Sequence, residues 1–396
     1  MPLALVQRCN PVLALYVALA MGAAWSLPFL RLAPNRLLTG EAVYLGDVLL
    51  QHGGQGNWAF LLALVVALAV WLCMAICWPK NRVIQTGVVL AMAWCLAGAW
   101  SLAGHFASSA TPADNVHART ALGSGFWTLC ALAWLAALDA IHRLHLSTLH
   151  RLVLQGALWL PLLLSLNEGQ HLSIAKEYAN HRDVLAPALL RHLQIVLLAV
   201  VPALGLGLLL AWRMTKTPPL RTAVFPVLNV IQTIPSIAVF GLLMGPLAWL
   251  ATQWPSLGRA GISGVGMAPA VLALLMYALL PIARSALAGL EQVPQDTVHA
   301  ARAMGMSQRQ VFLQVELPLA WPVLLIGLRT ALVQTIGLAA VSALVGAGGL
   351  GQIMFDGLYS AANELVMLGV IPIVLLATLA DTLFKVLGAL MRTPTR

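Results

Sequence analysis

Residues 299–318 read H-A-A-R-A-M-G-M-S-Q-R-Q-V-F-L-Q-V-E-L-P and separate two apolar segments of the chain. This polar interval predicts two short helices joined by a glycine turn. Asp296 is positioned as the N-cap of the first helix, and Gly305 stands where a left-handed C′ residue would end it. Ser307 and Gln310 have the S-x-x-Q spacing of a capping box, which begins the second helix.

The first of these helices is expected to need a partner surface. It exposes small and flexible side chains, namely Ala300, Ala301, Ala303 and Met304, and a helix of about two turns is marginal by itself in water. A cytosolic protein that takes up the helix in a groove would meet this need. Packing of the helix on its own bundle would meet it equally well, and the residues alone leave both interpretations open.

The composition on either side of this interval places the chain in a membrane. Hydrophobic residues make up 60% of its 396 residues and charged residues 9%, whereas a soluble domain has roughly 45–50% and about 25%. Soluble globular, disordered and coiled-coil proteins are therefore excluded. The predicted fold class is all-α, a polytopic membrane bundle of about ten transmembrane helices. The expected spans are 11–30, 57–78, 83–104, 122–141, 152–167, 187–212, 223–250, 265–289, 320–344 and 364–390.

The basic residues predict the orientation and the division of the chain. With the N-terminus inside, Lys and Arg in the inside segments outnumber those outside, so both termini are expected to be cytoplasmic. The net charge of +9 comes from basic residues spread singly, which favours this role over binding of nucleic acid. A polar loop, 168–186, divides the chain into residues 1–186, a membrane region of about five spans with no assigned role, and 187–396. The segment 11–30 is expected to be a retained span rather than a cleaved signal peptide.

The interval 299–318 resembles the EAA loop of ABC-importer permeases, which reads Glu-Ala-Ala, three residues, Gly, nine residues, Ile, one residue, Leu-Pro. This chain departs from the pattern at His299, which stands in place of Glu and removes a negative charge near a helix start. The resemblance implies that residues 291–320 form a cytoplasmic coupling loop that contacts a cytosolic ABC ATPase. The residues implied for this contact are His299, Ala300, Ala301, Met304, Gly305, Met306, Val315, Leu317 and Pro318.

Further stretches of the second half are similar to the osmoprotectant branch of that family, the importers for glycine betaine, choline and carnitine. These stretches are 229–236, 300–305, 315–318, 327–331 and 343–351. The resemblance implies that the last five spans form a type I permease core, which moves a small quaternary-ammonium osmolyte across the bacterial inner membrane. The implied partners are two copies of the ATPase, an external solute-binding protein and a second permease copy, identical or related.

The chain itself is expected to be neither an enzyme nor a cofactor-binding protein. The sequence contains no G-x-x-x-x-G-K-[ST] motif, so ATP would be used by the partner ATPase. Residues 346–351 match G-x-G-x-x-G, but no βαβ unit surrounds them, and a closely packed glycine turn at the outer end of a span is expected. No metal site is expected, because the histidines at 142, 145 and 150 lack a fourth ligand and a defined geometry.

Polar residues interrupt two of the spans in the second half. They are Asn229, Gln232 and Thr233, followed by Pro235, in the span 223–250, and Gln334 and Thr335 in the span 320–344. Polar groups in lipid are costly unless they are paired or face water. These residues therefore either line a translocation pathway along a broken helix or form interhelical hydrogen bonds. For the charged residues, Arg329 is expected to pair with a carboxylate, and Asp381 with Lys385.

Three other functions remain as alternatives. The first is a permease of the same architecture that carries methionine, taurine or another small polar solute. Only the branch-specific stretches argue against it. A lipid-modifying intramembrane enzyme would need clustered His, Asp or Glu residues at an interface. A structural or sensory role for residues 1–186 is the third alternative.

Overall fold

The computed structural model describes residues 9–35, 38, 40–53, 58–110 and 118–391. The chain forms two compact units, Met1–Asn180 and His181–Arg396. The terminal residues 1–8 and 392–396, to which the expectation of cytoplasmic termini applies, lie outside the described residues. The segment 168–186 was expected as a polar loop, but it is helical from Ser173 onward. The boundary between the two units falls within this helix.

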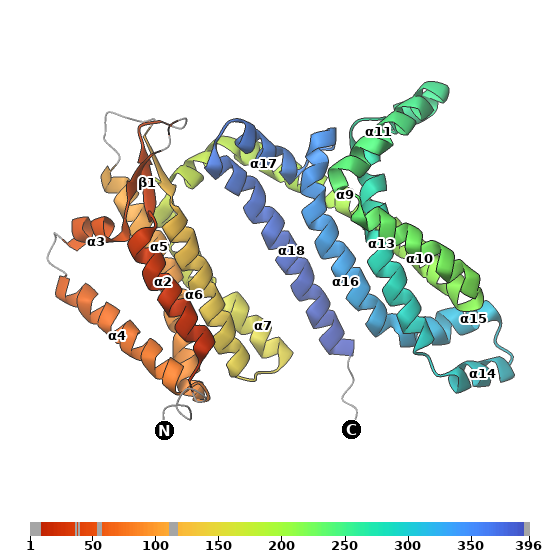
Figure 1. The fold of residues 1–396 in the computed structure, drawn as a ribbon, viewed down its shortest axis with the longest axis horizontal. Coiled ribbons are helices and arrows are strands. Elements are labelled where there is room, and N and C mark those ends of the chain that lie inside the picture. The colour runs from red at the N-terminus through yellow and green to blue at the C-terminus, as the bar shows by residue number, and fades with distance from the viewer. Residues whose placement is uncertain (1–8, 36–37, 39, 54–57, 111–117, 392–396) are drawn as a thin grey trace. The chain divides into compact units, whose positions relative to one another are not determined.

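Long helices form most of the first unit, in which α5 packs against α6 and α6 against α2 (Figure 1). Asn10 caps α2 with its side-chain oxygen, and its amide nitrogen donates to Asp139 Oδ2 on α6 at 2.7 Å. The helices of this unit are α2 (Pro11–Ser26), α3 (Leu45–Gly53), α4 (Trp58–Cys77), α5 (Arg82–Ala110), α6 (Ser124–Arg143), α7 (Thr148–Ala157) and α8 (Leu160–Leu164), with the 3-10 turn Leu166–Gly169.

A small antiparallel sheet at one end of the first unit was not predicted. Its strands β1 (Leu30–Ala33), β2 (Glu41–Val43) and β3 (Arg119–Leu122) have the order β2-β1-β3. Leu27 is extended, with φ −106° and ψ 140°, because Pro28 disfavours the helical region for the residue before it. The first expected span therefore ends as a helix at Ser26, and the strand follows.

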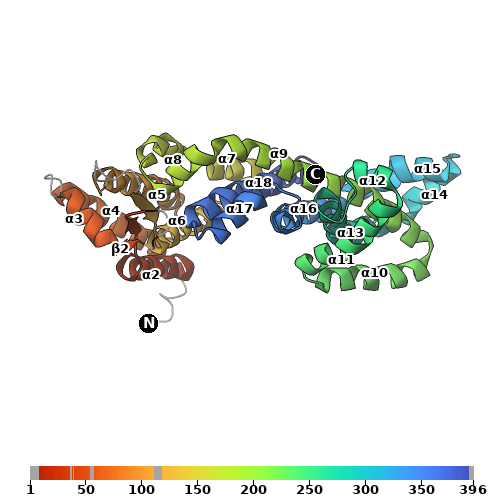
Figure 2. The ribbon, with the colours of Figure 1, turned by 90° about the horizontal axis from the view of Figure 1, so that it is seen from above.

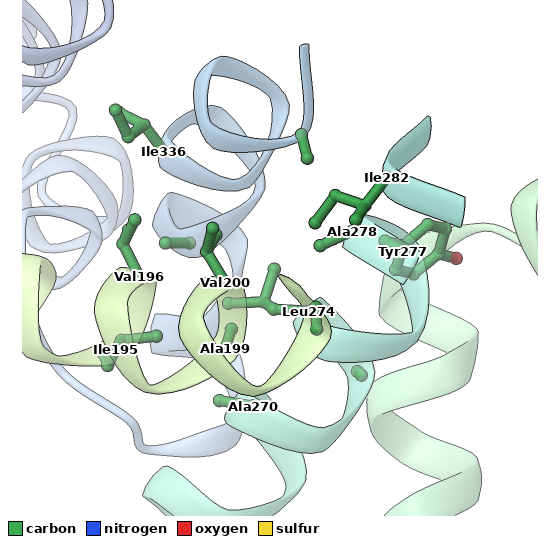
Figure 3. Close-up of a cluster of buried hydrophobic side chains, with 14 of the residues drawn as sticks. Ile195, Val196, Ala199, Val200, Ala270, Leu274, Tyr277, Ala278, Ile282 and Ile336 are labelled. Atoms are coloured by element: carbon green, nitrogen blue, oxygen red, sulfur yellow. The ribbon is translucent and has the colours of Figure 1, made fainter. Parts of the chain in front are cut away.

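The second unit is built around α9, α13 and α16. Figure 3 shows Ile195, Val196 and Val200 of α9 beside Leu274 of α13 and Ile336 of α16. The helices are α9 (Ser173–Lys216), α10 (Pro218–Thr233), α11 (Ser236–Gln253), α12 (Pro255–Arg259), α13 (Met267–Glu291), α14 (Gln295–Ala303), α15 (Gln308–Val311), α16 (Leu317–Val341), α17 (Leu350–Tyr359) and α18 (Asn363–Met391), with the π-helical segment Phe312–Glu316 and the 3-10 turn Ser342–Val345.

Each expected span contains an apolar helix. Seven helices in the described part of the chain are long and apolar enough to cross a membrane, namely Arg82–Ala110, Ser124–Arg143, Ser173–Lys216, Ser236–Gln253, Met267–Glu291, Gln308–Val345 and Asn363–Met391. Shorter apolar helices, Pro11–Ser26, Leu68–Cys77 and Leu149–Leu164, occupy the other three. The span 223–250 is divided into α10 and α11 (Figure 2), so the helical membrane fold is confirmed but one expected helix is broken.

Candidate functional site

The hairpin, which we define as residues 291–320, extends beyond the ends of α13 and α16 (Figure 1). Its first helix, α14, begins at Gln295, with Pro294 as the N-cap residue. Asp296 therefore lies in the first turn and is not the N-cap, contrary to the prediction. Proline explains the earlier start, because its φ, −59° here, is fixed near the helical value.

The turn between the two hairpin helices has the predicted left-handed glycine. Gly305 has a φ of +84°, and the amide of Met306 donates to the carbonyl of Ala301 at 3.3 Å. A further bond from the amide of Gly305 to the carbonyl of Arg302, at 2.9 Å, closes the turn. These bonds satisfy carbonyls that the end of a helix leaves free.

The capping box at the start of α15 is confirmed. The side-chain oxygen of Gln310 accepts from the amide of Ser307 at 2.8 Å, and the hydroxyl of Ser307 accepts from the amide of Gln310 at 3.4 Å. The second helix continues into the π-helical segment Phe312–Glu316 and then into α16. Single π-helical turns of this kind occur frequently at functional sites.

The hairpin has a small hydrophobic core of its own. Val293, Val298, Ala301 and Val311 are buried together. Ala301 is 3% exposed, so the expectation that it lies on the exposed face of the first helix was wrong. That expectation counted residues along one helix, whereas Ala301 lies in a cluster that includes Val311 on the returning segment.

The other face of α14 is exposed. His299 and Ala300 are exposed, and Met304 is 77% exposed. Of the remaining residues expected at the contact, Gly305 and Pro318 are exposed, and Met306, Val315 and Leu317 are half-buried. The first helix of the hairpin is therefore buried on one face by residues of the hairpin itself and exposed on the other.

One polar residue of α10, Gln232, belongs to a hydrogen-bonded group beside the break between α10 and α11. The hydroxyl of Tyr277 on α13 donates to the carbonyl of Ile234, which lies in the break. The side-chain amide of Gln232 donates to the carbonyl of Tyr277 at 2.6 Å and accepts from the side chain of Gln334 on α16 at 3.4 Å. Gln232 thus links three helices, and Pro235 lies exposed next to this polar group.

The other predicted polar residues do not join this group. Asn229 accepts a hydrogen bond from Arg284 at 2.6 Å. Thr233 donates to the carbonyl of Val230 at 2.7 Å, and Thr335, which is 1% exposed, bonds within its own helix. Sequence reasoning missed Tyr277 and Arg284, although each is a polar residue in an apolar segment, which is a signal for a paired group.

Two smaller expectations concern charged residues and the glycine turn. Asp381 on α18 pairs with Arg329 on α16 at 2.5 Å and with Lys385 at 2.8 Å, as predicted. Residues 346–349 form a turn in which positive φ values occur at 346, 348 and 349, and residues 350–351 begin α17. A Cβ on Gly349 would lie 3.3 Å from the Cα of His192 on α9, so glycine permits the close approach that was expected.

Comparisons with known proteins identify two matching families, one in each half of the chain. Residues 203–393 match the family described as the binding-protein-dependent transport system inner membrane component, and residues 7–175 match the N-terminal domain of the ABC transporter permease YehY. The osmoprotectant import permease protein OsmW of Salmonella typhimurium is 37% identical over 199 residues, which cover 50% of this chain and 87% of that protein.

A second relative is the glycine betaine/carnitine/choline transport system permease protein OpuCD of Bacillus subtilis, which is 39% identical over 47% of this chain and 73% of that protein. Among solved structures, a chain of the inward-facing MetNI methionine ABC transporter is 22% identical over 53% of this chain and 96% of that chain, with a TM-score of 0.45. The chain belongs to the family of binding-protein-dependent inner-membrane transport components and is a multi-pass permease subunit of an ABC importer.

Proposed function

We propose that this permease moves a small quaternary-ammonium osmolyte, such as glycine betaine, into the cell. The support is the set of relatives, whose names state osmoprotectants, glycine betaine, carnitine or choline. In this proposal an external binding protein delivers the solute, a second permease copy completes the channel, and both termini are cytoplasmic. Residues 187–396 form the core, and residues 1–186 are an additional membrane region.

The observation that carries the coupling proposal is the two-faced hairpin. Its inner face is fixed by the cluster around Val298 and Val311, while its outer face presents His299, Ala300 and Met304. A cytosolic ATPase binds this outer face, with small side chains permitting close approach of the backbones. Because the hairpin continues directly into α13 and α16, closure of two ATPase subunits displaces helices of the core.

To drive transport, the ATPase must bind one conformation of the permease more tightly than the other. Moving a two-state equilibrium from 1:99 to 99:1 needs about 5.5 kcal/mol of differential binding. An ATPase that bound the hairpin with equal affinity in both conformations of the permease would not shift the equilibrium between them. ATP hydrolysis belongs to the separate subunit, and this chain supplies the contact and the pathway.

The polar group at the break in α10 is the proposed lining of that pathway. Gln232, Gln334 and the Tyr277 carbonyl lie together where α10 ends. A broken helix exposes backbone and side-chain polar groups that can replace water around a solute in transit. Asn229, Thr233, Pro235 and Thr335 complete the proposed set, with Thr335 supporting from a buried position.

Uptake of radiolabelled glycine betaine, with and without the gene, tests the substrate. The proposal predicts uptake that requires the gene and that unlabelled choline or carnitine reduces by competition. Labelled methionine and taurine serve as controls. Loss of methionine or taurine uptake on deletion, with glycine betaine, choline and carnitine uptake all unchanged, would replace the osmolyte by another solute while leaving the permease architecture intact.

A further inference from the structure

The last turns of α9 contact the hairpin where α15 passes into the π-helical segment. The rings of Trp212 on α9 and Phe312 on the hairpin lie with centroids 5.6 Å apart and planes at 53°. Lys216 Nζ lies 3.8 Å from the centroid of the Trp212 ring and donates to Gln308 Oε1 at 3.2 Å. We call these four residues the α9 clamp. The aromatic contact and the hydrogen bond join α9 to the hairpin, and the cation–π contact within α9 holds Lys216 over the Trp212 ring.

The indole of Trp212 is placed for packing rather than for hydrogen bonding. Its Nε1 atom is buried and finds no acceptor among the residues that the structure describes. A buried indole normally has a partner for this group. The position of Trp212 is therefore set by the ring contact with Phe312 and by the cation above it.

A second contact holds the start of the hairpin to the same corner of the molecule. Arg221, near the start of α10, forms an ion pair with Glu291, the last residue of α13, at 2.7 Å. Only Thr217 separates α9 from the two prolines that begin α10, and proline fixes the backbone φ. The hairpin is thus attached on both sides to one stiff corner.

The far part of α9 contacts the glycine turn. Arg191 Nε donates to the carbonyl of Ala347 at 3.0 Å, and His192 Nε2 lies 3.1 Å from the carbonyl of Ile336. From His192 to Trp212 the helix is about 30 Å long at 1.5 Å per residue, which is close to the thickness of the hydrocarbon core of a bilayer. One continuous helix therefore contacts the hairpin at one end and the glycine turn at the other.

The middle of α9 is packed over this whole distance. Ile195, Val196, Ala199 and Val200 are buried against α13 and α16 (Figure 3). Beyond Pro202, which removes one backbone hydrogen bond, Gly207 approaches Ile282 so closely that a Cβ would lie 2.6 Å from a side-chain carbon of Ile282. The helix is supported on both sides of its weakest point.

We propose that α9 transmits the movement of the hairpin, at one end of this helix, to the glycine turn at its other end. Trp212 and Lys216 are the positioning residues that fix the hairpin to α9. The inference rests on the proposed function in that an ATPase moves the hairpin. Without the clamp the ATPase still binds and hydrolyses ATP, but the hairpin moves without displacing the far end of α9. The predicted defect is a loss of coupling, not of docking.

The test compares Trp212→Leu with Trp249→Leu in the full chain, reconstituted with its ATPase in nanodiscs. Trp249 is a matched control, because it also contacts an aromatic ring, that of Trp254 at 6.4 Å, but lies on α11. A fluorophore on Leu344→Cys, beside the glycine turn, reports movement of that turn on addition of ATP and vanadate without reference to any substrate. The five native cysteines are replaced by serine for this purpose.

We expect Trp212→Leu to retain the ATPase and its hydrolysis, to lose the fluorescence change, and to import glycine betaine at a rate per ATP reduced by about fivefold or more. Trp212→Phe restores both signals in part, and Trp249→Leu leaves them unchanged. An unchanged fluorescence response in Trp212→Leu, or loss of the ATPase itself, overturns the inference. Failure of the docking proposal has a different signature, since the ATPase would then remain bound when Met304 is altered.

A disulfide provides a second test that does not depend on the folding of the tryptophan variants. Lys216→Cys and Gln308→Cys together permit oxidative locking of the clamp. Because the clamp stays closed through the proposed cycle, we expect the fluorescence response to persist in the oxidised protein. Abolition of the response by oxidation, with recovery on reduction, would show that the contact opens in each cycle and would contradict transmission through α9.

Discussion

At Gly305 the backbone adopts a φ of +84°, a conformation that costs other residues roughly 1–2 kcal/mol. Nothing lies within 4 Å of the position that a Cβ would occupy, so strain is the main cost of a substitution. We expect Gly305→Ala to raise the amide exchange rate of the hairpin by roughly tenfold, and Gly305→Asn to raise it less, because Asn tolerates the left-handed region. Mass spectrometry measures this exchange, and equal rates in all three proteins would disprove the assignment of strain.

Met304 is the residue on which the docking proposal depends most. It is 77% exposed, and flexible apolar side chains suit a contact that repacks during a cycle. We expect Met304→Glu to insert normally and to weaken binding of the ATPase by at least about tenfold, since a charge in the centre of an interface is poorly tolerated. Quantitative co-purification measures the loss, with Gln295→Glu, exposed at the start of α14, as the control. Undiminished recovery of the ATPase with Met304→Glu would exclude Met304 from the contact.

Single residues were predictable from the sequence where a local rule governs them. Gly305 and the pair Ser307 and Gln310 follow turn and capping rules that need only the neighbouring residues, and the structure has them as predicted. Ala301 is buried in a cluster that includes Val311, ten positions further along the chain. A pattern read along one helix cannot supply a partner from the returning segment.

Among the elements, the break between α10 and α11 is stabilised by one side chain from a third helix. The hydroxyl of Tyr277 donates to the carbonyl of Ile234. We expect Tyr277→Phe to leave this carbonyl without a donor and to reduce stability by about 1–3 kcal/mol, lowering both the melting temperature in detergent and solute uptake. Tyr359→Phe is the control, because Tyr359 is 74% exposed. A melting temperature for Tyr277→Phe equal to that of the control would show that the hydroxyl contributes nothing.

The elements themselves were predictable to different degrees. The long apolar segments predicted the positions of the membrane helices, because a helix must be apolar over a sufficient length to cross the lipid. Pro235 indicated a broken helix, but the span was still expected as one element. The donor that stabilises the break, Tyr277, lies on α13, so the sequence around the break does not reveal it. The small sheet was missed because its strands are three or four residues long and pair across segments distant in the sequence.

On the scale of the whole molecule, the two units carry separate similarities. The match to OsmW covers 87% of that protein with only 50% of this chain. We expect a chain that begins at Ser173, where α9 starts, to insert, to bind the ATPase and to retain uptake. Uptake measured at equal membrane levels of the two chains tests this. Complete loss of uptake with the ATPase still bound would make the first unit an essential part of the pathway.

The division of the chain was harder to predict than its class. Composition alone excluded a soluble protein, since 60% hydrophobic and 9% charged residues leave too little polar surface. The segment 168–186 is polar enough to suggest a loop, yet α9 runs through it from Ser173 to Lys216. Polar residues indicate exposure to water. A helix that extends into water has this property as much as a loop does, so polarity alone cannot distinguish the two.

The most direct measurement places a photoreactive benzoylphenylalanine at Met304 and irradiates intact membranes that contain the whole transporter. Docking of the ATPase on the hairpin predicts a covalent adduct between this position and the ATPase subunit, identified by mass spectrometry, and no such adduct from the same group at Leu344. An adduct with the external binding protein at Met304, or an ATPase adduct at Leu344 alone, would contradict it.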